Sequence, residues 1–293
     1  MVSKKTTINP ATKKPYVGGQ AILEGVMMKG GNRIAMACRR PDGRIVVKEQ
    51  AYKTRASRFP LKLPFIRGIV FLIEMLITGM KALEWSANQQ MGKKDQLGKS
   101  SMVITIIISF ALAIGLFLGL PYLVAWLIIG NAPHSVAFNV VDGIARLVVF
   151  LAYIYLIGLW KDVHRLYQYH GAEHATVHCF EAGLPLTVAN VKTFSTVHVR
   201  CGTSLLVYVV GISIVVFSLI KVPQWYYNIP LRLVVLPLIG GISYEILKLS
   251  ARFPKSLFFL LLSLPGRWVQ RITTQKPTPK MIEVAIASIK RVI

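Results

Sequence analysis

The sequence predicts an α-helical integral membrane protein with about four transmembrane helices, an interfacial helix and a small N-terminal cytoplasmic α+β cap that contains a β-hairpin. Two observations predict this class. Apolar residues make up 54% of the 293 positions, and the mean hydropathy is +0.53. Charged residues make up only 16%, whereas soluble domains average about 25%. This composition excludes a disordered chain and an ordinary soluble enzyme.

Four segments are apolar enough to cross a bilayer. The first, residues 102–129, contains no Asp, Glu, Lys or Arg and exceeds the roughly 20 residues that a spanning helix needs. Three weaker candidates follow at residues 144–160, 203–220 and 229–249. We therefore expect a first transmembrane pair over 102–160 and a second over 202–249. Pro121 lies inside the first span, where a neighbouring helix or water can satisfy the backbone groups that it frees.

The lysines and arginines alternate between rich and poor loops. There are 19 in residues 1–101, none in 130–141, 4 in 161–201, 1 in 221–230 and 9 in 248–293. Under the positive-inside rule, this series predicts four spans with both termini in the cytoplasm. We therefore expect a multi-pass protein of the bacterial cytoplasmic (inner) membrane.

The formal net charge is +23, which by itself would indicate a nucleic-acid partner. In so apolar a chain, the same excess is expected in cytoplasmic loops that face anionic lipids. The expected partners are thus anionic lipids of the bilayer, with a membrane or ribosomal protein as a further candidate, and no specific DNA binding is expected.

Residues 1–64 are expected to form the basic cytoplasmic cap. Apolar and polar residues alternate on both sides of the turn signal P-D-G at 41–43, so residues 33–52 are predicted to form a β-hairpin. Residues 65–101 are expected to form an interfacial or re-entrant helix and a basic linker. Glu74 has apolar neighbours three and four positions away on both sides, which favours burial in protein or an interfacial position over a lipid-facing span.

Residues 250–293 are expected to form a cytoplasmic amphipathic tail. The apolar stretch at 256–264 is too short to span a bilayer, and an amphipathic segment follows it, so this part is predicted to lie along the membrane surface. After a Pro-containing break at 276–279, apolar residues recur at i, i+3 and i+4 and predict a short amphipathic helix.

Residues 161–201 are expected to form a cytoplasmic loop, and this loop holds five of the six histidines. His170, His174 and His178 recur every fourth residue and would share one face of a helix. The segment from His170 to His174 matches the H-x-x-E-H pattern of inverted zinc peptidases, in which two histidines ligate the metal and the glutamate activates water. Glu173 is therefore the first candidate catalytic residue.

These residue types suit a divalent metal, with zinc as the candidate, because neutral imidazoles combined with a carboxylate or thiolate are its preferred ligands. His170 and His174 are expected as two ligands, and the candidates for the third are His178, His198, Cys201 and Glu245. A hydrogen-bonded structural network and the binding of lipid phosphate are the open alternatives. Gly171 is unfavourable in a helix by about 1 kcal/mol relative to Ala, which weakens the prediction that the cluster is helical.

Two further glutamates are candidates. Glu245 lies near the cytoplasmic end of the last span, where a carboxylate is a functional candidate, although Lys248 or Arg252 on the same face could pair with it. Glu24 lies in the Gly-rich stretch 18–31, which is expected to form a tight loop–strand–loop and lacks the G-K-[ST] ending of a phosphate-binding loop. Glu24 is the second candidate catalytic residue.

The motifs together resemble those of the bacterial membrane family catalogued as domain of unknown function 1385, which is sometimes labelled a predicted metal-dependent enzyme. The matching stretches are GGQAILEGVMMKG, YHGAEHATVHCFEAG, STVHVRCGTS, GISYEILKLSARFP and PGRWVQRITTQKPTPKMIEVAIASIK. The chain has Ala175 where a lysine is common in the family and Val199 where a proline is common, and neither is a proposed ligand. The matching positions are Glu24, His170, Glu173, His174, His178, His198, Cys201 and Glu245.

Three functions remain in competition. The first is a metal-dependent, hydrolytic membrane enzyme with its His/Glu site at the cytoplasmic membrane face. The second is a non-enzymatic membrane factor whose basic surface binds a ribosome, anionic lipid or another membrane complex. The third is a small oligomeric transporter in which Arg146, Arg232 and Glu245 line a polar path. The metal, the substrate and the oligomeric state are left open by the sequence.

Overall fold

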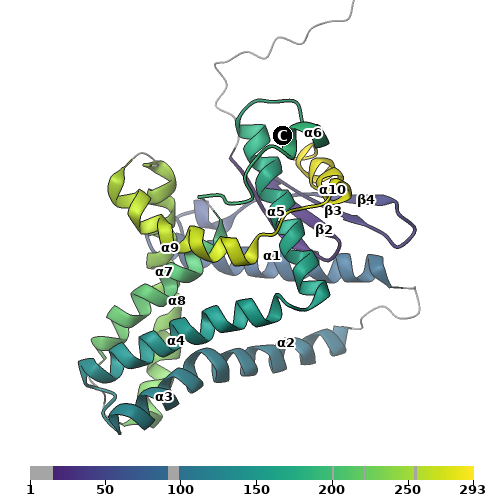
Figure 1. Ribbon diagram of the computed structural model, residues 1–293. Coiled ribbons are helices and arrows are strands. Elements are labelled where there is room, and N and C mark those ends of the chain that lie inside the picture. The colour runs from purple at the N-terminus through teal and green to yellow at the C-terminus, as the bar shows by residue number, and fades with distance from the viewer. Residues whose placement is uncertain (1–15, 92–98, 200, 221, 223, 254–255) are drawn as a thin grey trace, which may run out of the picture.

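The computed structural model describes residues 16–91, 99–199, 201–220, 222, 224–253 and 256–293. This part of the chain is mostly helical, with a four-stranded antiparallel sheet near its start (Figure 1). The elements are β1 (Val17–Ile22), β2 (Gly25–Gly30), β3 (Arg33–Arg39), β4 (Ile45–Ala51), η1 (Arg55–Ser57), α1 (Ile66–Gln90), α2 (Lys99–Ile114), η2 (Gly115–Gly119), α3 (Leu120–Ile129), α4 (Val136–Ile157), α5 (Lys161–Glu181), α6 (Val188–Val191), α7 (Gly202–Ser218), α8 (Trp225–Arg252), α9 (Leu257–Thr273) and α10 (Pro279–Ile289).

Among the residues that the structure describes, three helical segments are long and apolar enough to cross a membrane. They are Val103–Ile129, Val136–Ile157 and Tyr226–Ser250, and the apolar helix α7 is shorter, with 17 residues. Three of the four predicted segments are thus confirmed as candidate spans, while a crossing by α7 stays a prediction. The second segment begins at Val136 and not at residue 144 as predicted, because the charged Asp142 lies inside the helix and is buried there.

The first span contains a π-helical turn, η2, directly before Pro121. A proline has no N–H and displaces the carbonyl four residues earlier, which here belongs to Phe117. The Nε of Arg146 on α4 donates to this carbonyl at 3.0 Å. The prediction that a neighbouring helix satisfies a backbone group freed by Pro121 is confirmed.

The interior of the helical bundle holds a buried charge network. Asp142 accepts hydrogen bonds from Arg146 at 2.8 Å and from Arg232 of α8 at 2.9 Å. Arg146 also donates to Ser213 of α7 at 2.9 Å, and Arg232 donates to Asn139 at 2.7 Å. One carboxylate is therefore shared by two guanidinium groups from two helices. Both arginines are engaged in this network, which ties α4, α7 and α8 together.

The sheet is a meander with strand order β1-β2-β3-β4. Strands β3 and β4 confirm the hairpin predicted over residues 33–52. The prediction of a loop–strand–loop over residues 18–31 is wrong, because this stretch forms two strands, β1 and β2, with Gly18 opposite Lys29. Glu24 lies at the turn between them with φ of 50°.

Helices cover both faces of this sheet. One face packs against α5 and α10, which α6 contacts in turn, and the other packs against α1 (Figure 1). Because side chains alternate along a strand, Met28 and Ala35 face α5 and α10, while Met27 and Met36 face α1. Segments predicted to form a separate loop and tail are therefore part of the cap.

The 25-residue helix α1 is not among the candidate spans found in the described chain. Glu74 on α1 accepts hydrogen bonds from Tyr52 at 2.9 Å, from Thr54 at 2.6 Å and from the backbone N–H of Arg55 at 2.7 Å. The carboxylate is therefore satisfied by protein. Several apolar side chains of α1 remain exposed, namely Ile66, Ile73, Leu76, Ile77 and Leu83. Both features agree with the interfacial interpretation.

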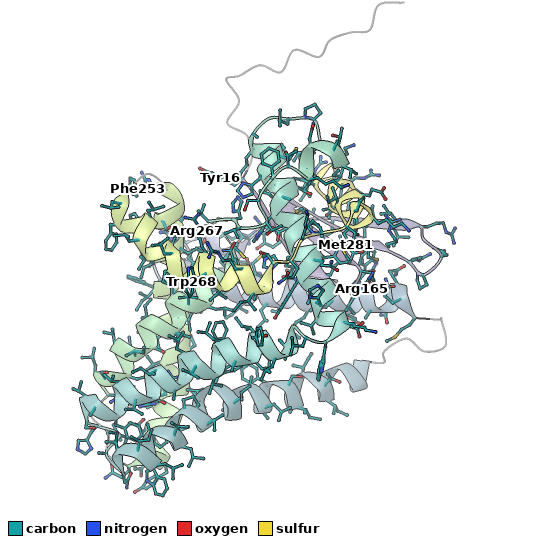
Figure 2. All side chains as sticks on the ribbon, in the orientation of Figure 1. Tyr16, Arg165, Phe253, Arg267, Trp268 and Met281 are labelled. Carbon is teal, nitrogen blue, oxygen red and sulfur yellow. The ribbon has the colours of Figure 1, made fainter. Side chains whose placement is uncertain are left out.

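The apolar stretch at 256–264 and the amphipathic segment after it form one helix, α9. Figure 1 shows α9 between the long apolar helices and the cap, and Figure 2 labels Arg267 and Trp268 on it. The predicted short amphipathic helix at the C-terminus is confirmed as α10. It is not exposed as a tail, because Ile282, Ala285 and Ile289 are fully buried against the sheet.

Candidate functional site

The predicted histidine face lies on α5, which continues without a break from Lys161 to Glu181. Gly171 is placed where another part of the chain crosses the helix. A Cβ atom at this position would lie 2.1 Å from the carbonyl oxygen of Gln275. The glycine therefore admits the segment that joins α9 to α10, and this segment helps to build the site.

Two imidazoles are fixed by backbone carbonyls. Nδ1 of His170 lies 2.9 Å from the carbonyl oxygen of Thr273, and Nδ1 of His174 lies 2.6 Å from that of Thr196. Because a carbonyl only accepts, Nδ1 is the donor in both rings, and Nε2 is the nitrogen left to ligate a metal. A histidine that ligates a metal is typically held by such a bond from its other ring nitrogen.

The thiol of Cys201 lies close to the Nε2 atoms of both histidines. Sγ of Cys201 lies 3.1 Å from Nε2 of His170. Cys201 is the N-cap residue of α7, and its sulfur accepts from the backbone N–H and the hydroxyl of Thr203 at 3.4 and 3.2 Å. These two bonds lower the pKa of the Cys201 thiol, but burial outweighs them. One ligand atom of each of His170, His174 and Cys201 lies within 4.8 Å of the others.

Glu173 lies against the same atoms. Its Oε2 is 4.0 Å from Nε2 of His170 and 3.9 Å from Nε2 of His174, and the backbone N–H of Gly19 donates to the carboxylate. The residue is only 4% exposed. Burial raises the pKa of Glu173 above its usual range, although His170 and the Gly19 bond act in the opposite direction. We name His170, Glu173, His174 and Cys201 the His170 group.

The electrostatics of the His170 group fit a cation. Burial lowers the pKa of His174, so its imidazole is neutral and ready to ligate. Burial also raises the pKa of Cys201 to about 12, which disfavours the thiolate unless a positive charge is nearby. A divalent metal supplies that charge and deprotonates a coordinating thiol. The two imidazole nitrogens and the sulfur of this group are ligands that Zn²⁺ prefers.

The His170 group opens into a cavity of about 330 Å³. Strand β1 lines it through Gly18 and Gly19, and α5 lines it through all three of its residues in the group. Cys201 and His198 complete the wall from the chain before α7. The donors are therefore accessible to a small ligand and not sealed in the protein core.

The other two predicted histidines form a separate cluster. One ligand atom of each of His178, Glu181 and His198 lies within 4.8 Å of the others. We name these three residues the His178 group. Burial lowers the pKa of His198 to about 4, so this imidazole is neutral at physiological pH. Sequence reasoning did not propose Glu181 as a ligand, although its spacing of three residues from His178 on a helix was the available signal.

The structure does not bring Glu245 or Glu24 to either group. Glu245 forms an ion pair with Arg67 of α1, which joins α1 to α8, and this partner is neither Lys248 nor Arg252. Glu24 forms an ion pair with Arg165 of α5 and accepts from the hydroxyl of Tyr169 at 3.3 Å. Neither glutamate lines the cavity, so the predicted roles in ligation and catalysis gain no support from this arrangement.

A family model and a known relative match the chain, and neither description states an activity. A family model described as "Protein of unknown function (DUF1385)" matches residues 63–293. The "Uncharacterized protein YqhQ" of Bacillus subtilis (strain 168) is 31% identical over 294 aligned positions, which cover 95% of this chain and 92% of the relative. No solved structure matches the chain. Matches of this length and identity show that the chain belongs to the DUF1385 family.

Proposed function

We propose that the protein is a membrane-anchored, metal-dependent hydrolase that uses the His170 group at the cytoplasmic face of the membrane. The observation that carries the proposal is the convergence of two imidazole lone pairs, a thiol and a buried carboxylate on one open cavity. Each imidazole is oriented by a bond from Nδ1 to a backbone carbonyl, as is typical of metal ligands. A purely structural network would not need the ligating nitrogens to face a cavity.

The residues of the group divide the work between them. His170, His174 and Cys201 would hold the metal, which when bound supplies Lewis acidity and lowers the pKa of water. Glu173 is the base that takes a proton from water in the cavity. Burial raises the pKa of Glu173, which makes the ionised carboxylate a stronger base, and the bond from the Gly19 N–H orients it.

The position of the site favours a substrate that is reached from the membrane surface. Helix α9 ends at Thr273, whose carbonyl anchors His170. The same helix exposes Leu257, Phe258, Leu261, Leu264 and Trp268, and Trp268 is 71% exposed. Exposed apolar side chains beside Arg267 and Arg271 are typical of helices that lie in the lipid interface and contact anionic headgroups. The distribution of basic residues along the chain supports a cytoplasmic location of both termini.

The test is metal content and activity of the full chain, purified in mild detergent without a His-tag. We expect a transition metal in the wild type and its loss from the double variant His170→Ala/His174→Ala. The matched control is His134→Ala/His164→Ala, which removes the same number of histidines outside the two groups and should keep the metal.

Activity is measured on fluorogenic ester, phosphate ester and peptide substrates in mixed micelles. We expect Glu173→Gln to keep the metal and to lose hydrolysis by at least about 100-fold, the usual contribution of a general base. Folded wild-type protein that stays metal-free after incubation with zinc or manganese would overturn the proposal, as would full activity of Glu173→Gln. The alternative of a non-enzymatic membrane factor would then take its place.

A further inference from the structure

We infer that the protein binds a second divalent metal ion, held by the His178 group beside the first site. The inference goes beyond the proposed function, because it rests on residues that share no ligand with the His170 group. His178 and Glu181 lie in the last turn of α5, and His198 faces them from the chain before α7. Two imidazoles and one carboxylate are a donor set that Zn²⁺, Co²⁺ and similar cations accept.

The two imidazoles are held close together. The ring centroids of His178 and His198 are 4.5 Å apart. Nε2 of His178 lies 2.9 Å from the carbonyl oxygen of Val197, so this nitrogen carries the proton and Nδ1 is the nitrogen with a lone pair. The arrangement repeats the carbonyl anchoring of His170 and His174 with the two ring nitrogens exchanged.

His198 is fixed through its backbone. The amide oxygen of Gln270 accepts from the backbone N–H of His198 at 2.7 Å, and the amide nitrogen of Gln270 donates to its carbonyl at 2.9 Å. Gln270 is fully buried on α9. A ligand held in this way loses little conformational freedom when it binds a metal, because its position is already set.

The Glu181 carboxylate supplies the negative charge of the group, and its exposure gives an ion access to the site. Oε2 of Glu181 lies 3.4 Å from Nε2 of His198. The Glu181 side chain is 37% exposed, whereas that of His198 is 6% exposed. One side of the group therefore reaches solvent, which gives an ion an entry path and leaves coordination positions open.

The two groups are neighbours. The ring centroids of His174 and His198 are 5.7 Å apart, and His198 also lines the cavity of the His170 group. An ion in each group would therefore lie near the same cavity. Sites with two adjacent cations bind anionic oxygen ligands from both sides.

The experiment is a cobalt titration of the full chain in detergent after removal of metals with a chelator. A thiolate ligand gives Co²⁺ an intense charge-transfer absorption, while nitrogen and oxygen ligands give only weak bands. Only the His170 group contains a thiol, so the two sites are spectroscopically distinct. We expect two equivalents of Co²⁺ in the wild type, one of them with the thiolate band.

Variants assign each equivalent. The double variant His178→Asn/Glu181→Gln should bind one equivalent and keep the thiolate band, whereas Cys201→Ser should lose the band and keep the other equivalent. The single variant Glu181→Gln changes only a half-exposed side chain and should weaken the second equivalent at least about tenfold, which guards against misfolding of the double variant. The control His164→Asn/Glu283→Gln should bind both.

The inference is overturned if the wild type binds only the equivalent with the thiolate band, or if the double variant at residues 178 and 181 still binds two. The result also separates the two proposals. Binding of one equivalent that lacks the thiolate band and is lost in Glu181→Gln would support the second site while contradicting the metal site of the proposed function.

Discussion

Replacing Gly171 by alanine tests whether the crossing of two chain segments shapes the proposed metal site. Judged from the helix alone, the substitution should stabilise the protein, because alanine is about 1 kcal/mol more favourable than glycine inside a helix. The structure predicts the opposite sign. The added methyl group would enter the space that the segment between α9 and α10 occupies.

The magnitude follows from three distances. The new Cβ would lie 2.1 Å from the carbonyl oxygen of Gln275 and 3.2 Å from Cγ2 of Thr196. The oxygen belongs to backbone that is itself held, since the N–H of Gln275 donates to the carbonyl of Tyr167 at 2.9 Å. Overpacking of this kind costs about 1–3 kcal/mol, and an overlap with backbone belongs at the upper end. After subtraction of the helix gain, we expect a net loss of about 2 kcal/mol.

Metal binding should weaken with stability, because the displaced segments also orient the ligands. Thr196 provides the carbonyl that anchors His174, and Thr273 near Gln275 provides the one that anchors His170. Loss of the hydrogen bonds that orient a ligating histidine lowers metal affinity about 10–100-fold. We expect an affinity for Zn²⁺ reduced to this extent.

The assay is thermal unfolding in detergent at a fixed scan rate, together with zinc competition. A loss of about 2 kcal/mol corresponds to a midpoint lower by about 4–8 °C for a protein of this size. The control is Gly211→Ala on α7, where a Cβ meets no atom within 4 Å. An unfolding midpoint of Gly171→Ala at or above that of the wild type, with unchanged zinc affinity, would refute the reasoning.

Four further predictions follow from the contacts. Asp142→Asn leaves two buried guanidinium groups without a counter-charge, so we expect the free energy of unfolding to fall by about 3–5 kcal/mol. The destabilised protein should aggregate in size-exclusion chromatography, and a monodisperse variant would contradict this. Arg67→Gln removes the ion pair with Glu245 and should release α1 at a cost of about 1–3 kcal/mol, seen as faster hydrogen exchange in α1 only. Glu24→Gln breaks a partly exposed pair and should change stability by less than about 1 kcal/mol without loss of metal. Burial lowers the pKa of His198 to about 4, so between pH 4 and 6.5 the unfolded chain binds more protons than the folded chain. Metal-free protein should therefore lose stability as the pH falls through this window, and the loss should be smaller in His198→Gln.

Patterns of neighbouring residues predicted those helices and strands that depend only on nearby residues. The hairpin at 33–52 follows from alternation around a turn signal, and the helix at the C-terminus follows from a period of three to four residues. The start of the second span was predicted too late, because hydropathy treats Asp142 as exposed to lipid. The residue is in fact neutralised by Arg232, 90 positions later in the chain.

The sequence predicted part of the composition of the candidate site but not its arrangement. The H-x-x-E-H spacing placed His170, Glu173 and His174 on one helix face, and the structure brings them to one cavity. Spacing along a helix could not predict which group each remaining ligand candidate joins, because Cys201 and His198 reach α5 from the chain before α7. It also could not find that Glu245 pairs with Arg67, 178 positions away.

The sequence by itself predicted a mostly helical, apolar chain, three of its candidate spans in order, the hairpin and the C-terminal amphipathic helix. These properties depend on residues within one or two turns of each other, where hydropathy and periodicity act. The tertiary structure alone decided that the N-terminal sheet, α5 and α10 form one cap, that carbonyls of Thr196 and Thr273 orient the imidazoles, and that six metal-ligand candidates separate into two groups and one ion pair. The reason is physical: a binding site requires atoms a few ångströms apart in space, and their positions follow from the packing of distant segments.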